Sequence, residues 1–293
     1  MEDWYQQSMR SLQLAGMSGP TQKGYTRSVR MLVEFYSKTP DLITEQELQD
    51  YFLHRKNISK WSSATMRICY SGIKFFFINV LRRNWHTLEF IRAKREKTLP
   101  TILSVPEVWK IINTVNTAQN KAYLTTVYTC GLRLNEGLNL QVTDIDGTRM
   151  RIHIHRGKGA KDRYVPLPST TLQIMRDYWK THRNSVFIFP SLGRSGNDGP
   201  TTEKPMAKAS VQGALRRVLK QLNIQKRISI HTLRHSYATH LLEAGVNIRR
   251  IQQYLGHSNL NTTMIYLHLT TQGHQRAYGI IDGLMKGDDH DNN

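Results

Sequence analysis

The chain has 293 residues, with 41 Lys or Arg and 22 Asp or Glu, so its formal net charge at pH 7 is +19. This length favours two domains, because single domains are commonly about 100–150 residues long. Hydrophobic residues make up 39% and are spread along the chain, which excludes extensive disorder. The apolar run 73–81 is interrupted by Lys74 and Asn79 and is too short for a membrane span, and the acidic start lacks a secretory-signal pattern. We therefore expect a cytoplasmic protein that does not enter a membrane.

The positive charge is divided over the whole chain. Residues 1–99 contain 16 basic and 9 acidic side chains, and residues 100–293 contain 25 and 13. A basic surface in both halves favours a polyanionic partner that touches both, and nucleic acid is the commonest such partner. A generally basic, well-solvated surface is the alternative, and charge alone does not separate DNA from RNA.

Helical patterns fill the first third of the chain. Thr44 and Glu47 have the spacing of a capping box, and another helix is predicted to begin near Ser62 or Ser63. Basic residues alternate with the apolar stripes, as in a small bundle that can bind a duplex. The residues predicted to face inward are Tyr25, Val29, Leu32, Val33 and Tyr36, then Leu48, Tyr51 and Phe52, then Ile68, Ile73, Phe76 and Phe77.

A charged segment over 92–101, which contains Pro100, predicts the boundary between two domains. We assign residues 1–95 to a helical N-terminal domain, 96–103 to a linker and 104–293 to a second domain. The second domain begins with a further capping-box pattern, Ser104 to Glu107, with Pro106 in the first helical turn.

The second domain then changes to the period of a strand. Met150, Ile152 and Ile154 alternate with polar residues, and 164–167 is predicted as the return strand after a glycine-containing turn over 157–162. A short strand is expected over 187–189, a loop over 190–205, helices from Ser210 and a final amphipathic segment over 277–284. The predicted fold class is therefore mainly α with a small antiparallel β-sheet (α+β).

Four segments of the second domain carry side chains suited to phosphoryl transfer. In their order, and with a tyrosine nine residues after a Gly-His pair, they resemble the tyrosine recombinase, or phage integrase, family. The resemblance covers about 103–266 and, more loosely, the helical first domain, and it implies a SAM-like core-binding domain followed by a catalytic domain. The segments are Cys130-Gly-Leu-Arg133-Leu-Asn-Glu136, Gly157-Lys158-Gly159, His231-Thr-Leu-Arg234-His235 and Leu255-Gly-His257-Ser-Asn-Leu-Asn-Thr-Thr-Met-Ile-Tyr266.

The resemblance also implies a role for each matching residue, and Lys161 is a rival for the role of Lys158. The six implied catalytic residues are the phosphate-binding pair Arg133 and Arg234, the general acid Lys158, the acid/base His231, the phosphate-bonded His257 and the nucleophile Tyr266.

These residue types suit the chemistry independently of the resemblance. Phosphoryl transfer needs positioning and stabilisation of charge on the phosphate oxygens, and a guanidinium offers paired donors that match two of those oxygens. Tyrosine has an ordinary pKa near 10, so it needs a base or nearby cations to become a nucleophile. A covalent phosphotyrosine conserves the energy of the broken bond, so ligation needs no ATP.

Single residues of this set also have simpler explanations. Glu136 can be the i,i+3 partner of Arg133. His231 and His235 have the spacing of helical zinc ligands, but Thr232 stands where that motif needs Glu.

Metal and cofactor sites are not predicted elsewhere. His153 and His155 share one face of the predicted strand, and without further Cys or His nearby we expect them to be solvated. Cys69 and Cys130 are expected to be small buried side chains, because two cysteines cannot form a four-thiolate site. We predict no metal, no cofactor and no nucleotide loop.

By this resemblance the chain would be a site-specific DNA recombinase that acts on double-stranded DNA through a 3′-phosphotyrosine and a Holliday junction. The family assembles four protomers on two duplexes, and the segment 277–284 would pack into a neighbouring protomer. The residues within the motifs favour an integrase of a mobile element, whereas the compact length is similar to that of Xer-type chromosome-dimer resolvases. A type IB topoisomerase-like enzyme, a protelomerase and a non-catalytic DNA-binding regulator are further alternatives. The candidate DNA contacts are Arg27, Arg30, Arg67, Lys74, Lys161 and Arg163.

Overall fold

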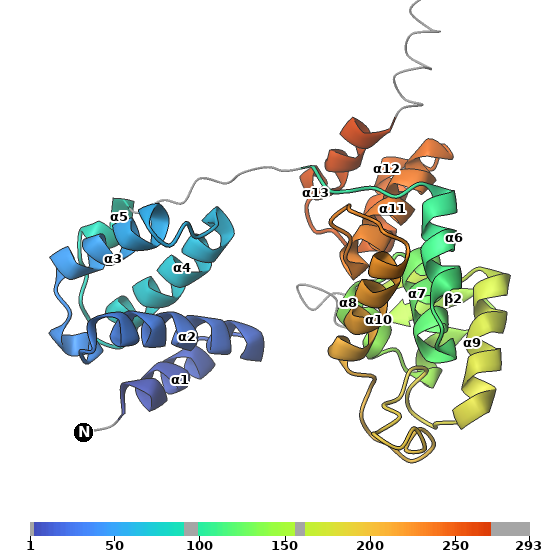
Figure 1. Ribbon diagram of the computed structural model, residues 1–293, viewed down its shortest axis with the longest axis horizontal. Helices are drawn as coiled ribbons and strands as arrows, with labels where there is room; N and C mark the ends of the chain where they lie inside the picture. The colour runs from blue at the N-terminus through green and yellow to red at the C-terminus, as the bar shows by residue number, and fades with distance from the viewer. Residues whose placement is uncertain (1–2, 91–98, 156–161, 271–293) are drawn as a thin grey trace, which may run out of the picture. The chain divides into compact units, whose positions relative to one another are not determined.

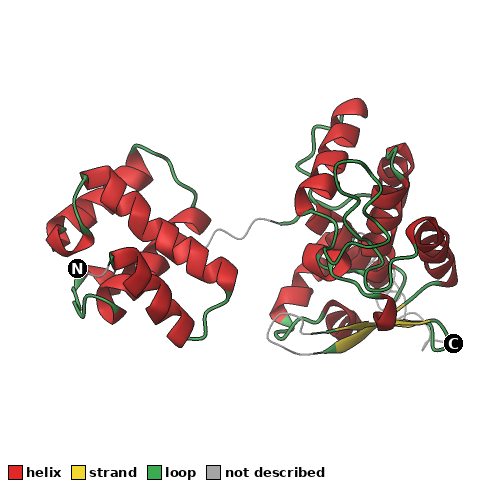
Figure 2. Ribbon diagram, turned by 90° about the horizontal axis from the view of Figure 1, so that it is seen from below, coloured by secondary structure: helices red, strands yellow, loops and turns green. Residues whose placement is uncertain are grey.

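The computed structural model describes residues 3–90, 99–155 and 162–270. The chain divides into two compact units, residues 1–98 and 99–293, each with its own hydrophobic core (Figure 1). The structure confirms the predicted fold class, since helices dominate both units and the second adds one small antiparallel sheet (Figure 2).

The first unit is a helical bundle. Gly72 lets two of its helices approach closely, because a Cβ at this position would lie 2.8 Å from Tyr25 Cα. Val29 and Leu32 from one helix and Ile73 and Phe76 from the other are fully buried between them. The helices are α1 (Trp4–Leu14), α2 (Gly19–Tyr36), the 3-10 turn η1 (Pro40–Leu42), α3 (Glu45–Asn57), α4 (Ser63–Asn79) and α5 (Thr87–Phe90).

Capping residues begin the helices where the sequence predicts. Thr44 Oγ1 accepts from the Glu47 backbone N–H at 3.2 Å, and Glu47 Oε2 accepts from the Thr44 N–H at 2.9 Å, so the box before α3 is complete. The Ser62 hydroxyl accepts from the Thr65 N–H at 3.2 Å, which places the start of α4 at Ser63.

One predicted core residue of α4 is wrong. The Ile68 side chain is 55% exposed, whereas Cys69, one position further, is buried. Four residues separate Cys69 from Ile73, so they share a helix face, while five residues turn Ile68 away from it. The sequence pattern was ambiguous here because apolar residues occur on more than one face of this helix.

The second unit surrounds its core with helices. Ser104 and Glu107 complete the second predicted capping box, and the predicted loop over 190–205 contains no helix. The elements are α6 (Val105–Thr114), α7 (Ala118–Cys130), α8 (Leu134–Leu138), the 3-10 turn η2 (Val142–Asp144), β1 (Ile145–Asp146), β2 (Arg151–Ile154), β3 (Arg163–Pro166), α9 (Ser169–His182), α10 (Lys208–Gln221), α11 (Ile230–Glu243), α12 (Ile248–Leu255), α13 (Asn261–Met264) and the 3-10 turn η3 (Ile265–Leu269).

The sheet has the order β1-β2-β3, and both of its pairings are antiparallel. Ile152 pairs with Val165 and both are fully buried, so the predicted hairpin and its alternation are confirmed. The short strand β1 was not predicted. The strand expected over 187–189 is wrong, because this stretch forms only isolated bridges, from Phe187 to Gln141 and from Pro190 to Pro205.

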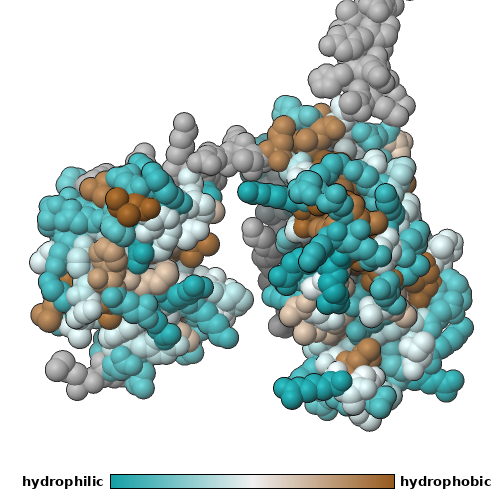
Figure 3. Space-filling view, viewed as in Figure 1, coloured by the Kyte–Doolittle hydropathy of each residue, from teal (hydrophilic) through white to brown (hydrophobic). Residues whose placement is uncertain are grey.

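Cys69 and Cys130 are buried free thiols, as predicted. On the face seen in Figure 3, hydrophilic residues cover much of each unit, and apolar patches are scattered among these residues. Among the described residues, no helix combines the length and apolar character that crossing a membrane requires.

Candidate active site

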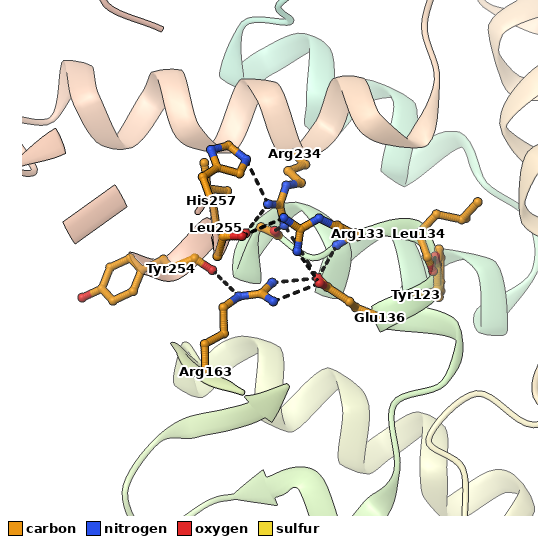
Figure 4. Close-up of polar contacts among 11 residues, drawn as sticks. Tyr123, Arg133, Leu134, Glu136, Arg163, Arg234, Tyr254, Leu255 and His257 are labelled. Atoms are coloured by element: carbon orange, nitrogen blue, oxygen red, sulfur yellow. Dashed lines mark hydrogen bonds and ion pairs between the residues drawn. The ribbon is translucent and has the colours of Figure 1, made fainter. Parts of the chain in front are cut away.

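Glu136 in α8 is shared by three arginine side chains (Figure 4). Arg163 binds both carboxylate oxygens, with Nη1–Oε1 at 2.9 Å and Nη2–Oε2 at 2.7 Å. Arg133 donates from Nη1 to Oε1 at 2.7 Å and from its backbone N–H to Oε2 at 2.8 Å. Arg234 Nη1 lies 3.7 Å from Oε2. One carboxylate therefore orients three guanidinium groups that come from three different elements.

The same arginines bind the C-terminal end of α12 through consecutive main-chain oxygens. The last carbonyls of a helix have no intrahelical partner and carry the negative end of its dipole, so they attract cations. These contacts fix each guanidinium at a second point. They run from Arg163 Nε to Tyr254 O at 2.8 Å, from Arg234 Nη2 to Leu255 O, and from Arg133 Nη2 to Gly256 O at 3.0 Å.

Two glycines of the sequence motifs make this arrangement possible. Gly131 ends α7 with φ +61°, and its carbonyl accepts from Arg234 Nη1 at 2.7 Å. A side chain at this position would overlap the ring of Tyr237. Gly256 ends α12, also with φ +61°, and a Cβ there would lie 2.8 Å from Arg163 Cδ. Both positions need glycine because of positive φ and close contact.

The cluster keeps a net positive charge. Burial alone would raise the pKa of Glu136, but the hydrogen bonds and charge of Arg163, followed by the contacts of Arg133, lower it to about 2. Burial, together with the charge of Arg133, lowers the pKa of Arg234 to about 9, so this guanidinium remains charged at neutral pH. Three cations with one anion leave a site that favours a bound anion. Arg133 uses two of its five side-chain N–H donors in the contacts above, within the described part of the chain.

His257 extends the cluster directly after Gly256. Its Nε2 lies 3.3 Å from Arg234 Nη2, and its Nδ1 lies 3.0 Å from Thr263 Oγ1. Burial, with the charges of Arg234 and Arg133, lowers the pKa of His257 to about 3, so the ring is neutral at pH 7. Because a guanidinium only donates, Nε2 accepts from Arg234, and the one proton of the neutral ring lies on Nδ1, toward Thr263 Oγ1.

Tyr266 in η3 is only 1% exposed, and its hydroxyl lies 2.9 Å from His235 Nδ1. Burial raises the pKa of Tyr266 above its ordinary value, while the positive charges of Arg234 and Arg133 oppose that rise. Burial, together with His231 and Arg234, lowers the pKa of His235 to about 4. A neutral His235 therefore faces the hydroxyl within the same chain as both arginines.

The remaining predicted residues of the second unit lie in different settings. His231 stands in the first turn of α11, with an exposed side chain, and partial burial and the charges of Arg234 and Arg133 lower its pKa. Lys158, Lys161 and the segment 277–284 lie outside the described residues.

The predicted DNA contacts of the first unit lie on its helices. Arg27 and Arg30 are exposed on α2, and Arg30 Cζ lies 5.5 Å from the centre of the Tyr5 ring. Arg67 and Lys74 are half-buried on α4.

Three residues have roles at the site that the sequence did not predict. The pairing of Glu136 with Arg133 is confirmed, but its sharing by Arg163 and Arg234 was not predicted. Arg163 was expected to contact DNA, yet its side chain is 8% exposed and engaged inside the protein. His235 was considered only as a zinc ligand. Its neighbour Arg234, which belongs to the motif, was the only signal that could have drawn attention to it.

Comparisons with known proteins match both units. The model of the Phage integrase family matches residues 101–273, and that of the Phage integrase N-terminal SAM-like domain matches residues 4–87. A tyrosine recombinase of Thermosipho africanus is 33% identical over 264 residues, which cover 86% of this chain and 89% of the relative. The tyrosine recombinase XerA of Pyrococcus horikoshii is 32% identical over 264 residues, which cover 89% and 87%.

A solved structure has the same fold over nearly its whole length. The Tn1549 transposon integrase, in complex with transposon right end DNA, aligns with a TM-score of 0.71 at 18% identity. The alignment covers 95% of this chain and 99% of that one.

Proposed function

Since this chain belongs to the phage integrase family, we propose that it is a tyrosine recombinase that cleaves and rejoins double-stranded DNA through a covalent 3′-phosphotyrosine. One observation supports this most strongly. A tyrosine hydroxyl and two arginines anchored on Glu136 lie in one chain, and both arginine charges act on that hydroxyl. The arginines are fixed at both Glu136 and the end of α12, as a preorganised anion site requires.

In the proposed step, the Tyr266 oxygen attacks the scissile phosphorus. A bond forms between this oxygen and phosphorus, and the bond between phosphorus and the 5′ oxygen breaks. Arg133 and Arg234 stabilise the negative charge on the non-bridging oxygens. By family resemblance, His257 gives a further hydrogen bond, for which its ring takes the tautomer with the proton on Nε2. By family resemblance, Lys158 gives a proton to the departing 5′ oxygen. Attack by a 5′ hydroxyl on the phosphotyrosine reverses these changes and reseals the strand.

The proton of Tyr266 needs an acceptor, and the hydrogen bond to His235 Nδ1 supplies one in the described chain. We expect His235→Gln to slow cleavage about 10²-fold, because an amide can hold the hydroxyl but cannot take its proton. His231→Gln is the matched comparison, since its ring also belongs to α11. Single-turnover cleavage of a nicked duplex would measure both rates. A larger loss in His231→Gln than in His235→Gln would assign proton transfer to His231, the residue that the family resemblance implies.

Tyr266→Phe tests the proposed function itself. The change removes only the attacking oxygen, so we expect complete loss of the denaturant-resistant protein–DNA adduct on a nicked suicide substrate, with duplex affinity nearly unchanged. Tyr254→Phe is the control, because Tyr254 contributes its main-chain oxygen to the site. An adduct at the wild-type yield in Tyr266→Phe would refute the assignment. If the wild-type chain forms no adduct, a DNA-binding regulator would be favoured instead.

The proposed assembly is a homotetramer on two duplexes that passes through a Holliday junction, with the segment 277–284 packed against a neighbouring protomer. The two units would both contact the duplex, which agrees with the excess of basic residues in each. A monomer that relaxes supercoils without exchanging strands would instead indicate a topoisomerase-like enzyme.

The proposed biological role is integration of a mobile element, as the motif wording favours. Trapping the covalent complex on genomic DNA and sequencing the attached ends would test this role. Ends at element boundaries support it, whereas a single chromosomal site would indicate a chromosome-dimer resolvase.

A further inference from the structure

A cluster of two histidines and one aspartate lies where β2 ends and β3 begins. His153 and His155 come from the end of β2 and the residue after it, and Asp162 directly precedes β3. We propose that these three side chains bind a divalent transition-metal ion of the Zn²⁺ class. The cluster shares no residue with the arginine site, and the sequence spacing did not predict it.

The two ligand-atom distances to Asp162 are close to those of a tetrahedral zinc site. Asp162 Oδ2 lies 3.2 Å from His153 Nε2 and 3.8 Å from His155 Nδ1, and one ligand atom from each residue falls within 4.8 Å of the others. With metal–ligand bonds of about 2.0–2.2 Å, tetrahedral ligand atoms lie roughly 3.3–3.6 Å apart. Shifts of a few tenths of an ångström would bring both Asp162 contacts into this range, and rotation of the two imidazole side chains would set the third separation. Two imidazoles and one carboxylate leave a fourth position for water, and they are ligands that zinc accepts.

Asp144, at the end of η2, supports the ligand His155. Its Oδ1 lies 2.8 Å from His155 Nε2, and the side chain is only 6% exposed. Its other oxygen accepts the Gln141 backbone N–H at 2.8 Å, so the carboxylate is held in place. Within the described residues, Oδ1 accepts no hydrogen bond, so its approach to His155 Nε2 is a close ion-pair contact and not an aligned hydrogen bond. A carboxylate that orients a histidine by its second nitrogen is the arrangement commonly found behind metal ligands.

The contact with Asp144 affects which atom of His155 faces Asp162. If the proton of a neutral ring is on Nε2, the nitrogen nearer Asp144, the lone pair at Nδ1 lies on the side of the Asp162 carboxylate. A cation between Nδ1 and Asp162 removes that repulsion, whether the cation is a metal ion or a second proton on the ring. The position of His153 favours the metal, because its ring also lies within reach of Asp162, at a centroid distance of 3.8 Å from the His155 ring.

His153 is oriented before any ion binds. Its ring stacks on Tyr164 at 4.7 Å between centroids and 20° between planes, and Arg151 Cζ lies 4.1 Å from the centre of the Tyr164 ring. Two of the three ligands are thus fixed by neighbours, His155 by Asp144 and His153 by Tyr164. An ion would join the end of β2 to the start of β3.

Zinc titration of the chelator-treated full-length chain tests the site directly, without DNA and independently of catalysis. By calorimetry, we expect wild type to bind one Zn²⁺ per chain, and His153→Gln, His155→Gln and Asp162→Asn each to bind it at least about tenfold more weakly. His86→Gln is the control, because this exposed histidine of the first unit lies outside the cluster. It should bind zinc as wild type does. Thermal unfolding without zinc should be the same for all variants.

Asp144→Asn gives a second test. We expect zinc affinity to fall by about 10–100-fold, as is typical when the partner of a metal-bound histidine is changed. Bound Co²⁺ should give the visible absorption of a tetrahedral site in the wild type, and a weaker one in His155→Gln. Equal zinc binding by wild type and the three ligand variants would overturn the proposal. So would a wild-type chain that binds no zinc.

Discussion

Two arginines of the first unit and the three arginines of the candidate site in the second are held in opposite ways. Arg27 and Arg30 of the first unit are exposed on α2, whereas the side chains of Arg133, Arg163 and Arg234 in the second are 21%, 8% and 4% exposed. An exposed arginine attracts a polyanion over a distance, and salt screens it. A buried arginine that is fixed at two points presents its donors in one geometry. The same residue type therefore suits affinity in one unit and the positioning of a single phosphate in the other.

Removing the shared anion should produce the largest effect. Glu136→Gln leaves three neighbouring guanidinium groups without their common carboxylate, and we expect the free energy of unfolding of the second unit to fall by about 3–5 kcal/mol. Urea denaturation would measure this change. Glu203→Gln, at an exposed loop position, is the control and should change stability by less than about 0.5 kcal/mol.

The effect of Glu136→Gln should also depend on pH in one direction. The pKa of Glu136 is lowered from an ordinary 4.5 to about 2, so its stabilising contribution is complete above pH 4.5 and is lost as the pH falls through 2. The stability difference between wild type and variant should therefore shrink across this range. A constant difference would show that the carboxylate charge is not its source.

Arg163→Lys tests whether Arg163 positions the other arginines of the site or contacts DNA. An ammonium group cannot bind both oxygens of Glu136 and the Tyr254 carbonyl, so we expect cleavage to slow about 10–100-fold through displacement of the neighbouring arginines. The salt dependence of DNA binding, measured by fluorescence anisotropy, should stay unchanged. Arg163→Gln tests whether Arg163 contacts DNA. If the slope of log affinity against log salt concentration becomes about 0.9 less steep in this variant, Arg163 contacts a phosphate, as the sequence predicts.

Arg27→Gln combined with Arg30→Gln should have the smallest effect on chemistry. We expect the salt slope of DNA binding to fall by about 0.9 for each phosphate that the variant no longer neutralises, while the cleavage rate at saturating DNA stays at the wild-type value. Arg194→Gln, an exposed arginine in the loop 190–205, is the control. An unchanged slope in the double variant would place the DNA contacts of the first unit elsewhere.

Local signals in the sequence predicted local structure well. The capping boxes at Thr44 and Ser104 and the alternation around Ile152 depend on neighbours within a few residues, and all three are confirmed. Ile68 was misplaced because its helix has apolar residues on several faces, and only packing against another helix selects one of them.

The arrangement of the candidate site could be predicted only in part. Motif order drew attention to Arg133, Arg234, His257 and Tyr266, but, apart from the pairing of Glu136 with Arg133, not to their partners. Arg163 and Glu136 are 27 residues apart, and His235 and Tyr266 are 31 apart. No periodic pattern relates residues at such separations, because the turn of the chain between them sets which side chains meet.

The end of α12 is bound through main-chain oxygens, which every type of amino acid carries. Tyr254 can therefore be exchanged during evolution without loss of the oxygen that Arg163 contacts, provided that the helix keeps its path. Gly256 has no such freedom, since any side chain would meet Arg163 and disfavour the backbone angle. Among Tyr254, Leu255 and Gly256, the glycine should therefore vary least, although it has no side chain.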